Sequence, residues 1–245
     1  MQKLQKLIAG PSLPHALFAI GISLMYLSLG PAIHRTIDFF TSHPDEASLK
    51  DKVFSCICLL IFVATLLRFI PGALYFFREI HPRCIHRTSS NKSEATSDES
   101  VPKGLYSDLL ALIVRGFAFI FLSKAVTRPP EFFAIYAALM LFDSLWLRYT
   151  CWLRTCVEES LLEDMLITIY RRRPPIEATH LWLVNNSCTF LFLALTYHVF
   201  KVNVISYHAL FALGSVLCML NCALDFYLTA WVYFPELDRH GRQKA

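Results

Sequence analysis

Charged and amide side chains stand inside long apolar runs of this chain, where such groups are rare. The charges are Arg68, Arg115, Asp143 and Asp225, and the amides are Asn185, Asn186 and Asn221. A charge at the centre of a bilayer costs about 2.5–3.5 kcal/mol on insertion scales, so residues of this kind face a polar interior and find partners there. In that setting, carboxylates and guanidinium groups form ion pairs, relay protons or line the path of an ion.

The spacing of these residues predicts that they meet at one depth. Arg68, Asp143 and Asp225 each lie about ten residues before the cytoplasmic end of an expected span, which is about 15 Å of helix and half the hydrocarbon thickness. Arg115 lies at a similar depth on a span that runs the opposite way. Because two Arg and two Asp sum to zero charge, we predict one connected interior network. We expect Arg115 and Asp143 to pair directly and Asp225 to be the functional member.

A second pair is expected closer to the cytoplasmic edge. Asp108 and Arg148 lie about 6–8 Å inside that edge by the rise of a helix. A short turn at 127–131 joins the two spans that carry them, which makes these spans antiparallel neighbours. We therefore predict a partly hydrated salt bridge of modest energy between the two residues.

The elements that position these groups are read from the apolar runs. The chain has 245 residues, of which 55% are hydrophobic and 17% charged, whereas a soluble domain averages about 25% charged. A helix of about 20 apolar residues crosses the hydrocarbon. Runs of this length occupy residues 13–33, 53–77, 105–126, 132–153, 177–200 and 204–234. The sequence predicts a single all-α membrane domain, a bundle of six transmembrane helices arranged as three hairpins.

The segments between the spans carry the signals for orientation. Lys and Arg number 14 in the termini and loops of one side and 6 in the loops of the other, which predicts that both termini are cytoplasmic. Residues 34–52 and 88–103 are polar, and we expect a loop over the first stretch and disorder over the second. Residues 154–173 are expected to form a cytoplasmic amphipathic helix, whose Arg171, Arg172 and Arg173 would contact anionic lipid.

The chain matches motifs of enzymes and cofactor sites only in part. Asn221 and Asp225 form half of an N-x-x-x-D-x-x-x-D box, but Thr229 takes its third position and no second acidic box follows. His81 and His86 match one histidine box without its companions. The eight cysteines show neither a zinc spacing nor a disulfide framework. These patterns favour a protein that is not an enzyme, with no metal, no cofactor and no nucleic-acid partner.

A weak repeat links the second and sixth expected spans. Aligning Arg68 with Asp225 brings Phe69 onto Phe226, and further on Ala73 onto Ala230 and Phe77 onto Phe234. Both segments run from outside to inside, so the repeat would be parallel rather than inverted.

Two functions of different classes remain open. The first is a channel-like, transport-like or permeability-altering protein that uses the polar layer. The second is a non-transporting scaffold or accessory protein whose cytoplasmic loops bind a protein partner or a second copy of the chain. In the second case the polar layer is architectural, because ion pairs and amides also hold membrane helices together.

Overall fold

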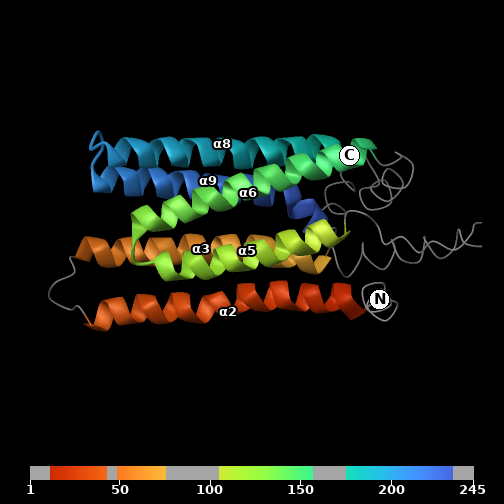
Figure 1. Ribbon diagram of the computed structural model, residues 1–245. Coiled ribbons are helices and arrows are strands. Elements are labelled where there is room, and N and C mark those ends of the chain that lie inside the picture. Colours follow the sequence, from red (N-terminus) through yellow and green to blue (C-terminus); the bar gives the residue numbers. More distant parts are fainter. Residues whose placement is uncertain (1–11, 43–48, 76–104, 157–174, 234–245) are drawn as a thin grey trace, which may run out of the picture.

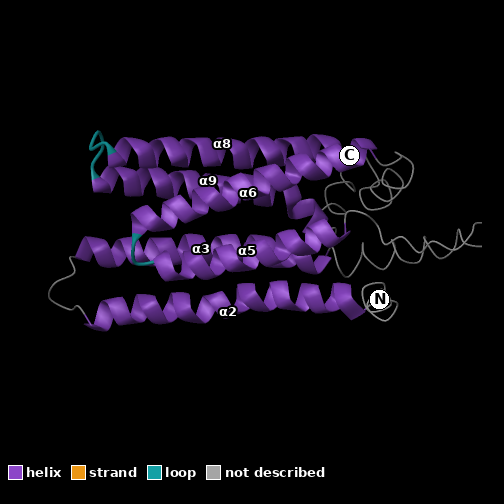
Figure 2. Ribbon diagram, in the orientation of Figure 1, coloured by secondary structure: helices purple, strands orange, loops and turns teal. Residues whose placement is uncertain are grey.

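The computed structural model describes residues 12–42, 49–75, 105–156 and 175–233, with side chains within 16–42, 49–69, 109–149 and 183–226. Apart from short turns, these residues are helical (Figure 2). In chain order the six helices are α2 (Ser12–Ser42), α3 (Leu49–Tyr75), α5 (Leu105–Ala125), α6 (Pro129–Cys156), α8 (Pro175–Lys201) and α9 (Tyr207–Tyr233). The prediction of an all-α fold is confirmed for this part of the chain.

A tight turn joins α5 to α6. The Arg128 amide donates to the carbonyl of Ala125 at 2.8 Å, and the Phe132 amide donates to the carbonyl of Arg128 at 3.0 Å. Proline suits the first turn of a helix, because amides there have no partner within the helix, and α6 begins at Pro129. Glu131 follows in that first turn, where a negative charge is favoured, and pairs with Arg128 at 2.7 Å.

The turn between α8 and α9 is also built from residues that suit a tight turn. Asn203 adopts a positive φ of 59°, a conformation that asparagine tolerates better than most residues. Ser206 caps α9, since its hydroxyl accepts a hydrogen bond from the Ala209 amide at 3.3 Å. Both turns are short, so each forces the helix that follows it to reverse direction.

Helix α2 is longer than expected. The sequence predicts a loop over the polar stretch 34–52, but α2 continues to Ser42 and α3 begins at Leu49. The extension carries its own support, because Thr36 donates to the carbonyl of Ala32 at 3.0 Å and His34 pairs with Asp38 at 2.7 Å. The polar side chains of His34, Arg35 and Asp38 therefore lie on an exposed helix end, whereas residues 43–48 are outside the described part of the chain.

Two expected segments lie outside the described residues. These are the polar segment 88–103 and, beyond Cys156, the remainder of the amphipathic segment 154–173 with Arg171, Arg172 and Arg173. Helix α6 itself continues to Cys156, slightly past the expected end of its span at 153.

The helices lie roughly along one direction and form a bundle (Figure 1). Helix α2 packs mainly along α5, α6 packs mainly along α8, and α9 packs along both α8 and α3. The turns that follow α5 and α8 lie at one end of the bundle, and α2 begins and α9 ends at the other (Figure 1).

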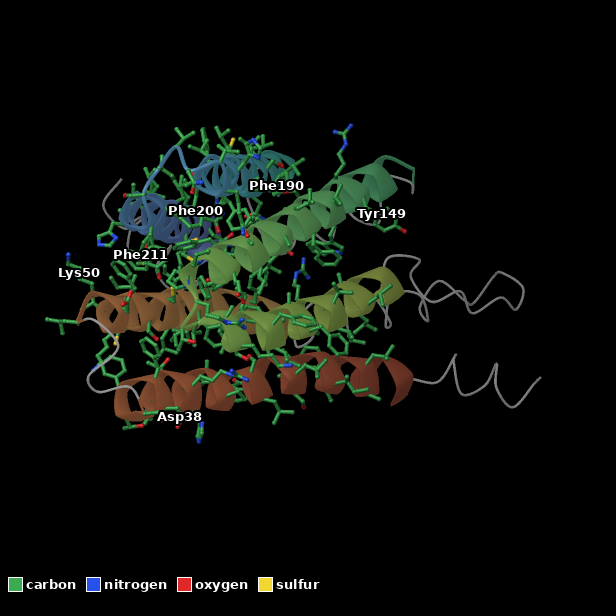
Figure 3. The ribbon with its side chains drawn as sticks, turned by 60° about the vertical axis from the view of Figure 1, so that its left-hand side comes forward. Asp38, Lys50, Tyr149, Phe190, Phe200 and Phe211 are labelled. Carbon is green, nitrogen blue, oxygen red and sulfur yellow. The ribbon has the colours of Figure 1, made fainter. Side chains whose placement is uncertain are left out.

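The outer surface of the bundle is apolar. Five helices are long and apolar enough to cross a membrane: Ala16–Ser42, Leu49–Phe69, Pro129–Tyr149, Leu183–Lys201 and Tyr207–Phe226. Leucines on several helices are more than half exposed, among them Leu27 at 68%, Leu110 at 63%, Leu145 at 61% and Leu191 at 60%. Figure 3 shows side chains standing outward around the bundle as well as filling it. A surface of this kind fits a lipid environment, since soluble proteins rarely expose large apolar patches.

Glycine permits the close contact between α2 and α5. A Cβ added to Gly116 would lie 2.7 Å from Cβ of Leu24 and 3.2 Å from the carbonyl oxygen of Gly21. Neither atom belongs to a flexible side-chain end, so the two helices would have to separate. Small residues at a helix interface allow this approach in membrane bundles.

We expect Gly116→Ala to destabilise the protein by about 1–3 kcal/mol through overpacking. Gly30 is the matched control, because a Cβ added there would meet no atom within 4 Å apart from its chain neighbours. Gly30→Ala should change stability by less than about 1 kcal/mol, because the higher helix propensity of alanine is offset by its crowding against the Pro31 ring. Thermal unfolding of the purified proteins in detergent checks both, and equal melting temperatures would show that the contact is not tight.

Candidate functional site

The most buried charges among the described residues are Arg68 on α3 and Asp225 on α9, with side chains 1% and 0% exposed. Nε of Arg68 lies 2.6 Å from Oδ2 of Asp225, in an ion pair whose atoms are not aligned as a hydrogen bond. The other two nitrogens of Arg68 donate to amides, Nη1 to Oδ1 of Asn221 at 2.5 Å and Nη2 to Oδ1 of Asn186 at 3.1 Å. Each nitrogen of the guanidinium therefore has a partner.

The amides tie this ion pair to two further helices. Nδ2 of Asn221 donates to Oδ1 of Asn186 at 3.0 Å, which links α9 to α8. The Tyr136 hydroxyl of α6 donates to Oδ1 of Asn221 at 3.1 Å. Asn185 is only partly buried and donates to the backbone carbonyl of Asn221 at 3.2 Å. Side chains from α3, α6, α8 and α9 thus meet in one hydrogen-bonded cluster.

A second ion pair joins α5 to α6. Nε of Arg115 donates to Oδ1 of Asp143 at 2.7 Å, and the two side chains are 10% and 3% exposed. This is the direct pair expected from the sequence. The Arg115 guanidinium also lies over aromatic rings, 4.3 Å from the Trp146 centroid and 5.9 Å from that of Phe142, an arrangement that favours a partly dehydrated cation. Oδ2 of Asp143 is buried without a hydrogen-bond partner among the described residues.

Phe69 lies against both guanidinium groups. Its ring centroid is 4.9 Å from Cζ of Arg68 and 5.5 Å from Cζ of Arg115. Arg68 is also within electrostatic reach of Asp143. The expected single network consequently has two polar centres, one at Arg68 and one at Arg115, which share an aromatic neighbour.

Helices α3 and α9 run in the same direction and meet in a constant register. Thr65 contacts Cys222, with 3.6 Å between Oγ1 and Sγ, at an offset of 157 positions in the sequence. The same offset relates Arg68 to Asp225 and relates Phe54 to Phe211, whose rings stack 3.8 Å apart. The weak repeat between these two segments has this offset as well. Arg68 and Asp225 therefore occupy equivalent positions on two parallel helices that face each other.

The shallow pair remains a prediction. The Arg148 side chain is exposed near the end of α6, and the side chain of Asp108 lies outside the described residues.

Sequence reasoning missed three neutral members of the cluster. Tyr136, Thr65 and Cys222 are buried beside it. One signal was present, since Tyr136 precedes Asp143 by two helical turns and so shares its face of α6. Thr65 and Cys222 carried no comparable signal, because small polar residues and cysteines are common in apolar spans.

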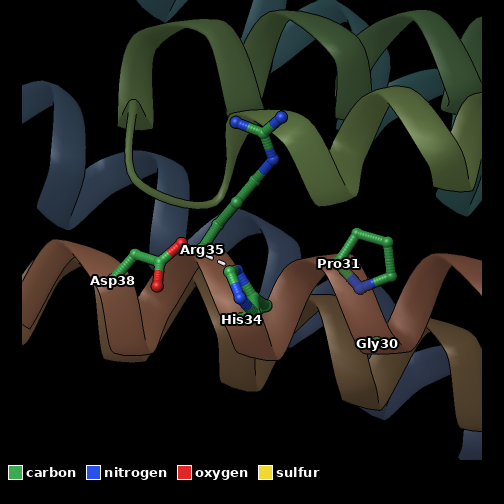
Figure 4. A pocket seen from close by; sticks show the side chains of 5 residues that line it. All are labelled: Gly30, Pro31, His34, Arg35 and Asp38. Atoms are coloured by element: carbon green, nitrogen blue, oxygen red, sulfur yellow. Dashed lines mark ion pairs between the residues drawn. The ribbon is translucent and has the colours of Figure 1, made fainter.

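A groove at the exposed end of α2 contains none of the residues of the two buried ion pairs (Figure 4). Gly30, Pro31, His34, Arg35 and Asp38 line it, and all belong to one helix. The Arg35 side chain extends away from the His34–Asp38 pair (Figure 4). Among the described residues, groups of three or more His, Cys, Asp or Glu side chains placed to hold a metal are absent.

The geometry leaves one candidate site, the buried cluster around Arg68 and Asp225 with its neighbour at Arg115 and Asp143. Comparison of the chain with protein-family models, curated proteins and solved structures gives no match.

Proposed function

We propose that this chain is a multi-pass membrane protein that moves a small ion across the bilayer through its polar layer. In this proposal α5 joins the five apolar helices as a sixth span, and the spans pair as three hairpins. The bilayer is then the main partner, and Arg171, Arg172 and Arg173 contact anionic headgroups on the cytoplasmic side.

The proposed orientation places both termini in the cytoplasm, from the excess of Lys and Arg in the loops of that side. Reporters inserted at residues 43–48 and at 88–102 are expected to report opposite sides of the membrane. Two enzymatic reporters, one active only in the cytoplasm and the other only on the opposite side, separate the two locations. Identical signals from the two insertions would contradict six spans.

The observation that carries the transport proposal is the Arg68–Asp225 pair at the contact of α3 and α9. Transporters built from parallel repeats hold their substrate and coupling ions near the midplane, where the repeats meet. Arg68 and Asp225 lie at equivalent positions of two parallel helices and are almost completely buried. A buried ion pair is often less stabilising than apolar side chains of the same size, so stability alone is a weak reason for keeping one.

In this proposal the described state is a closed gate. The ion pair and its amide partners fill the contact between α3 and α9, with no net charge at the point of closure. A transported species must separate or neutralise one of the two charges. Asp225 is the charge that is more easily neutralised, because a carboxylate is neutralised by one proton whereas a guanidinium stays charged.

Flux into liposomes tests this proposal. Purified protein is reconstituted, and the movement of protons, potassium and chloride is followed with ion-sensitive dyes against protein-free liposomes. We expect flux of at least one of these species above the protein-free level. Absence of flux for all of them, with correctly inserted protein, would contradict the proposal.

One observation favours the scaffold alternative. Every nitrogen of Arg68 already has a partner, which is what a static lock between helices requires. A scaffold with this lock would show no flux, and its function would reside in cytoplasmic segments that bind a protein partner or a second copy. The flux experiment therefore separates the two functions.

A further inference from the structure

The contact between α3 and α9 also holds a row of thiol and hydroxyl groups outside the ion pair. We name it the α3–α9 seam and define it as Cys58 and Thr65 of α3 with Ser215, Cys218 and Cys222 of α9. Cys58, Thr65 and Cys218 are 0% exposed and Cys222 is 3% exposed. The hydroxyl oxygen of Ser215 is buried without a hydrogen-bond partner among the described residues. Such a group destabilises the fold, so it calls for an explanation.

Cys222 connects the seam to the Arg68 cluster. Its Sγ lies 3.6 Å from Oγ1 of Thr65 and 3.5 Å from the Tyr136 hydroxyl. Thr65 already donates its own proton to the carbonyl of Ile61 at 2.7 Å, so toward Cys222 it acts as an acceptor. Asp225 follows Cys222 by three residues and lies on the same face of α9.

The seam extends from Cys222 toward the other end of the bundle. Cys218 lies one turn before Cys222 on the same face of α9, and both are buried. In the register that pairs Thr65 with Cys222, Cys58 of α3 lies opposite Ser215 of α9. Ser215 lies one turn further along α9. The row thus spans several turns of the α3–α9 contact, from Ser215 to Asp225.

Aromatic side chains close the far end of the seam. The rings of Phe54 and Phe211 stack there, with centroids 3.8 Å apart. His208 is exposed beside them, and its ring meets the edge of Phe54 at 5.7 Å. Figure 3 shows Phe211 at this end of the bundle, between α9 and α3. Stacked rings of this kind oppose the entry of a hydrated ion, while the His208 imidazole is exposed beside them.

We infer that the transported species is the proton, and that it reaches Asp225 from the outer side along the α3–α9 seam. This inference rests on the proposed transport function and names its substrate. A proton moves along a row of hydroxyl and thiol groups when each group gives its proton to the next and receives another, and the Cys222 thiol already contacts Thr65 and Tyr136. Any other cation would meet Arg68, and any anion would meet Asp225.

The transfer is a sequence of proton exchanges. A proton enters from the outer solution beside His208, and the hydroxyl and thiol groups of the seam each pass on one proton and accept one. Asp225 becomes a neutral carboxylic acid, while Arg68 stays protonated and keeps its bonds to Asn186 and Asn221. Loss of the proton toward the cytoplasm restores the ion pair, so one positive charge crosses per cycle. The other groups that face this cluster are Tyr136 from α6 and, within reach of Arg68, Asp143.

Variants of Cys222 test the seam in liposomes that carry a pH-sensitive dye and a potassium–valinomycin clamp. Cys222→Ala removes the relay group, and we expect proton flux per inserted molecule to fall about tenfold or more. Cys222→Ser restores a group that both donates and accepts, and should restore most of the flux. Cys188→Ala is the matched control, because Cys188 is an exposed thiol on α8, and it should leave flux unchanged.

The outcomes separate the seam from the transport proposal. Proton flux that falls in Cys222→Ala and recovers in Cys222→Ser supports the inference. Proton flux that is the same in all variants overturns the seam as the path. Flux of potassium or chloride without proton flux overturns the proton as substrate and leaves transport standing, whereas no flux of any species overturns both proposals.

Discussion

Replacing Arg68 alone with leucine is expected to cost about 3–5 kcal/mol of stability. Replacing both Arg68 and Asp225 with leucine should restore most of that loss. The single change leaves a carboxylate buried at 0% exposure without its counter-charge. The double change removes both charges and fills the space with apolar atoms. It still leaves Asn186 and Asn221 bonded to each other, since Asn221 donates to Asn186 directly at 3.0 Å.

Thermal or denaturant unfolding in detergent, with the fraction of monodisperse protein, measures this difference. The pair between Arg128 and Glu131 serves as a control, because its atoms are also 2.7 Å apart but its side chains are 57% and 49% exposed. Glu131→Gln should cost less than about 1 kcal/mol. If the double variant at 68 and 225 is as unstable as the sum of the two single variants, the energetics of this pair have been misjudged.

The sequence was a good guide to the helices and to the pairing of Arg115 with Asp143. Apolar runs of spanning length have a simple cause, the absence of water in the hydrocarbon, and the structure places a helix on each of the six expected runs. Depth follows from the constant rise of a helix. A short turn makes two helices neighbours, so the pairing of Arg115 with Asp143 follows from the sequence alone.

The sequence was a poor guide to contacts between helices that are distant along the chain. It does not decide whether Asp225 has Arg68 or the amides Asn185 and Asn186 beside it. The structure pairs Asp225 with Arg68, which also donates to Asn221 and Asn186. Which helix faces which depends on packing details such as the fit of Gly116 against Leu24. The sequence does not show which side of a span packs against another helix, because lipid and neighbouring helices both favour apolar side chains.

The largest functional effect is expected from Asp225→Asn. Asparagine keeps the shape of the side chain and an oxygen that can accept a hydrogen bond from Arg68, but it cannot take up and release a proton. If Asp225 carries the transported charge, flux per inserted molecule should fall by about 100-fold or more, the scale of a positioned proton-transfer group. Reconstituted flux, divided by the amount of monodisperse inserted protein, gives this number directly.

Asp143→Asn separates that role from architecture, because it removes the same charge from the same polar layer. Its partner Arg115 retains contacts with aromatic rings, at 4.3 Å for Trp146 and 5.5 Å for Phe69. Neither Asp143 nor Arg115 belongs to the α3–α9 seam. We expect Asp143→Asn to lower folded yield no more than Asp225→Asn, because its ion pair is the less buried of the two. Flux per inserted molecule should stay within about threefold of the wild type, a barrier change of less than about 1 kcal/mol. An architectural layer predicts the opposite pattern, in which both variants lose activity only in proportion to the protein that fails to fold. Equal flux per inserted molecule in Asp225→Asn and the wild type would remove Asp225 from the mechanism and leave it as a structural partner of Arg68.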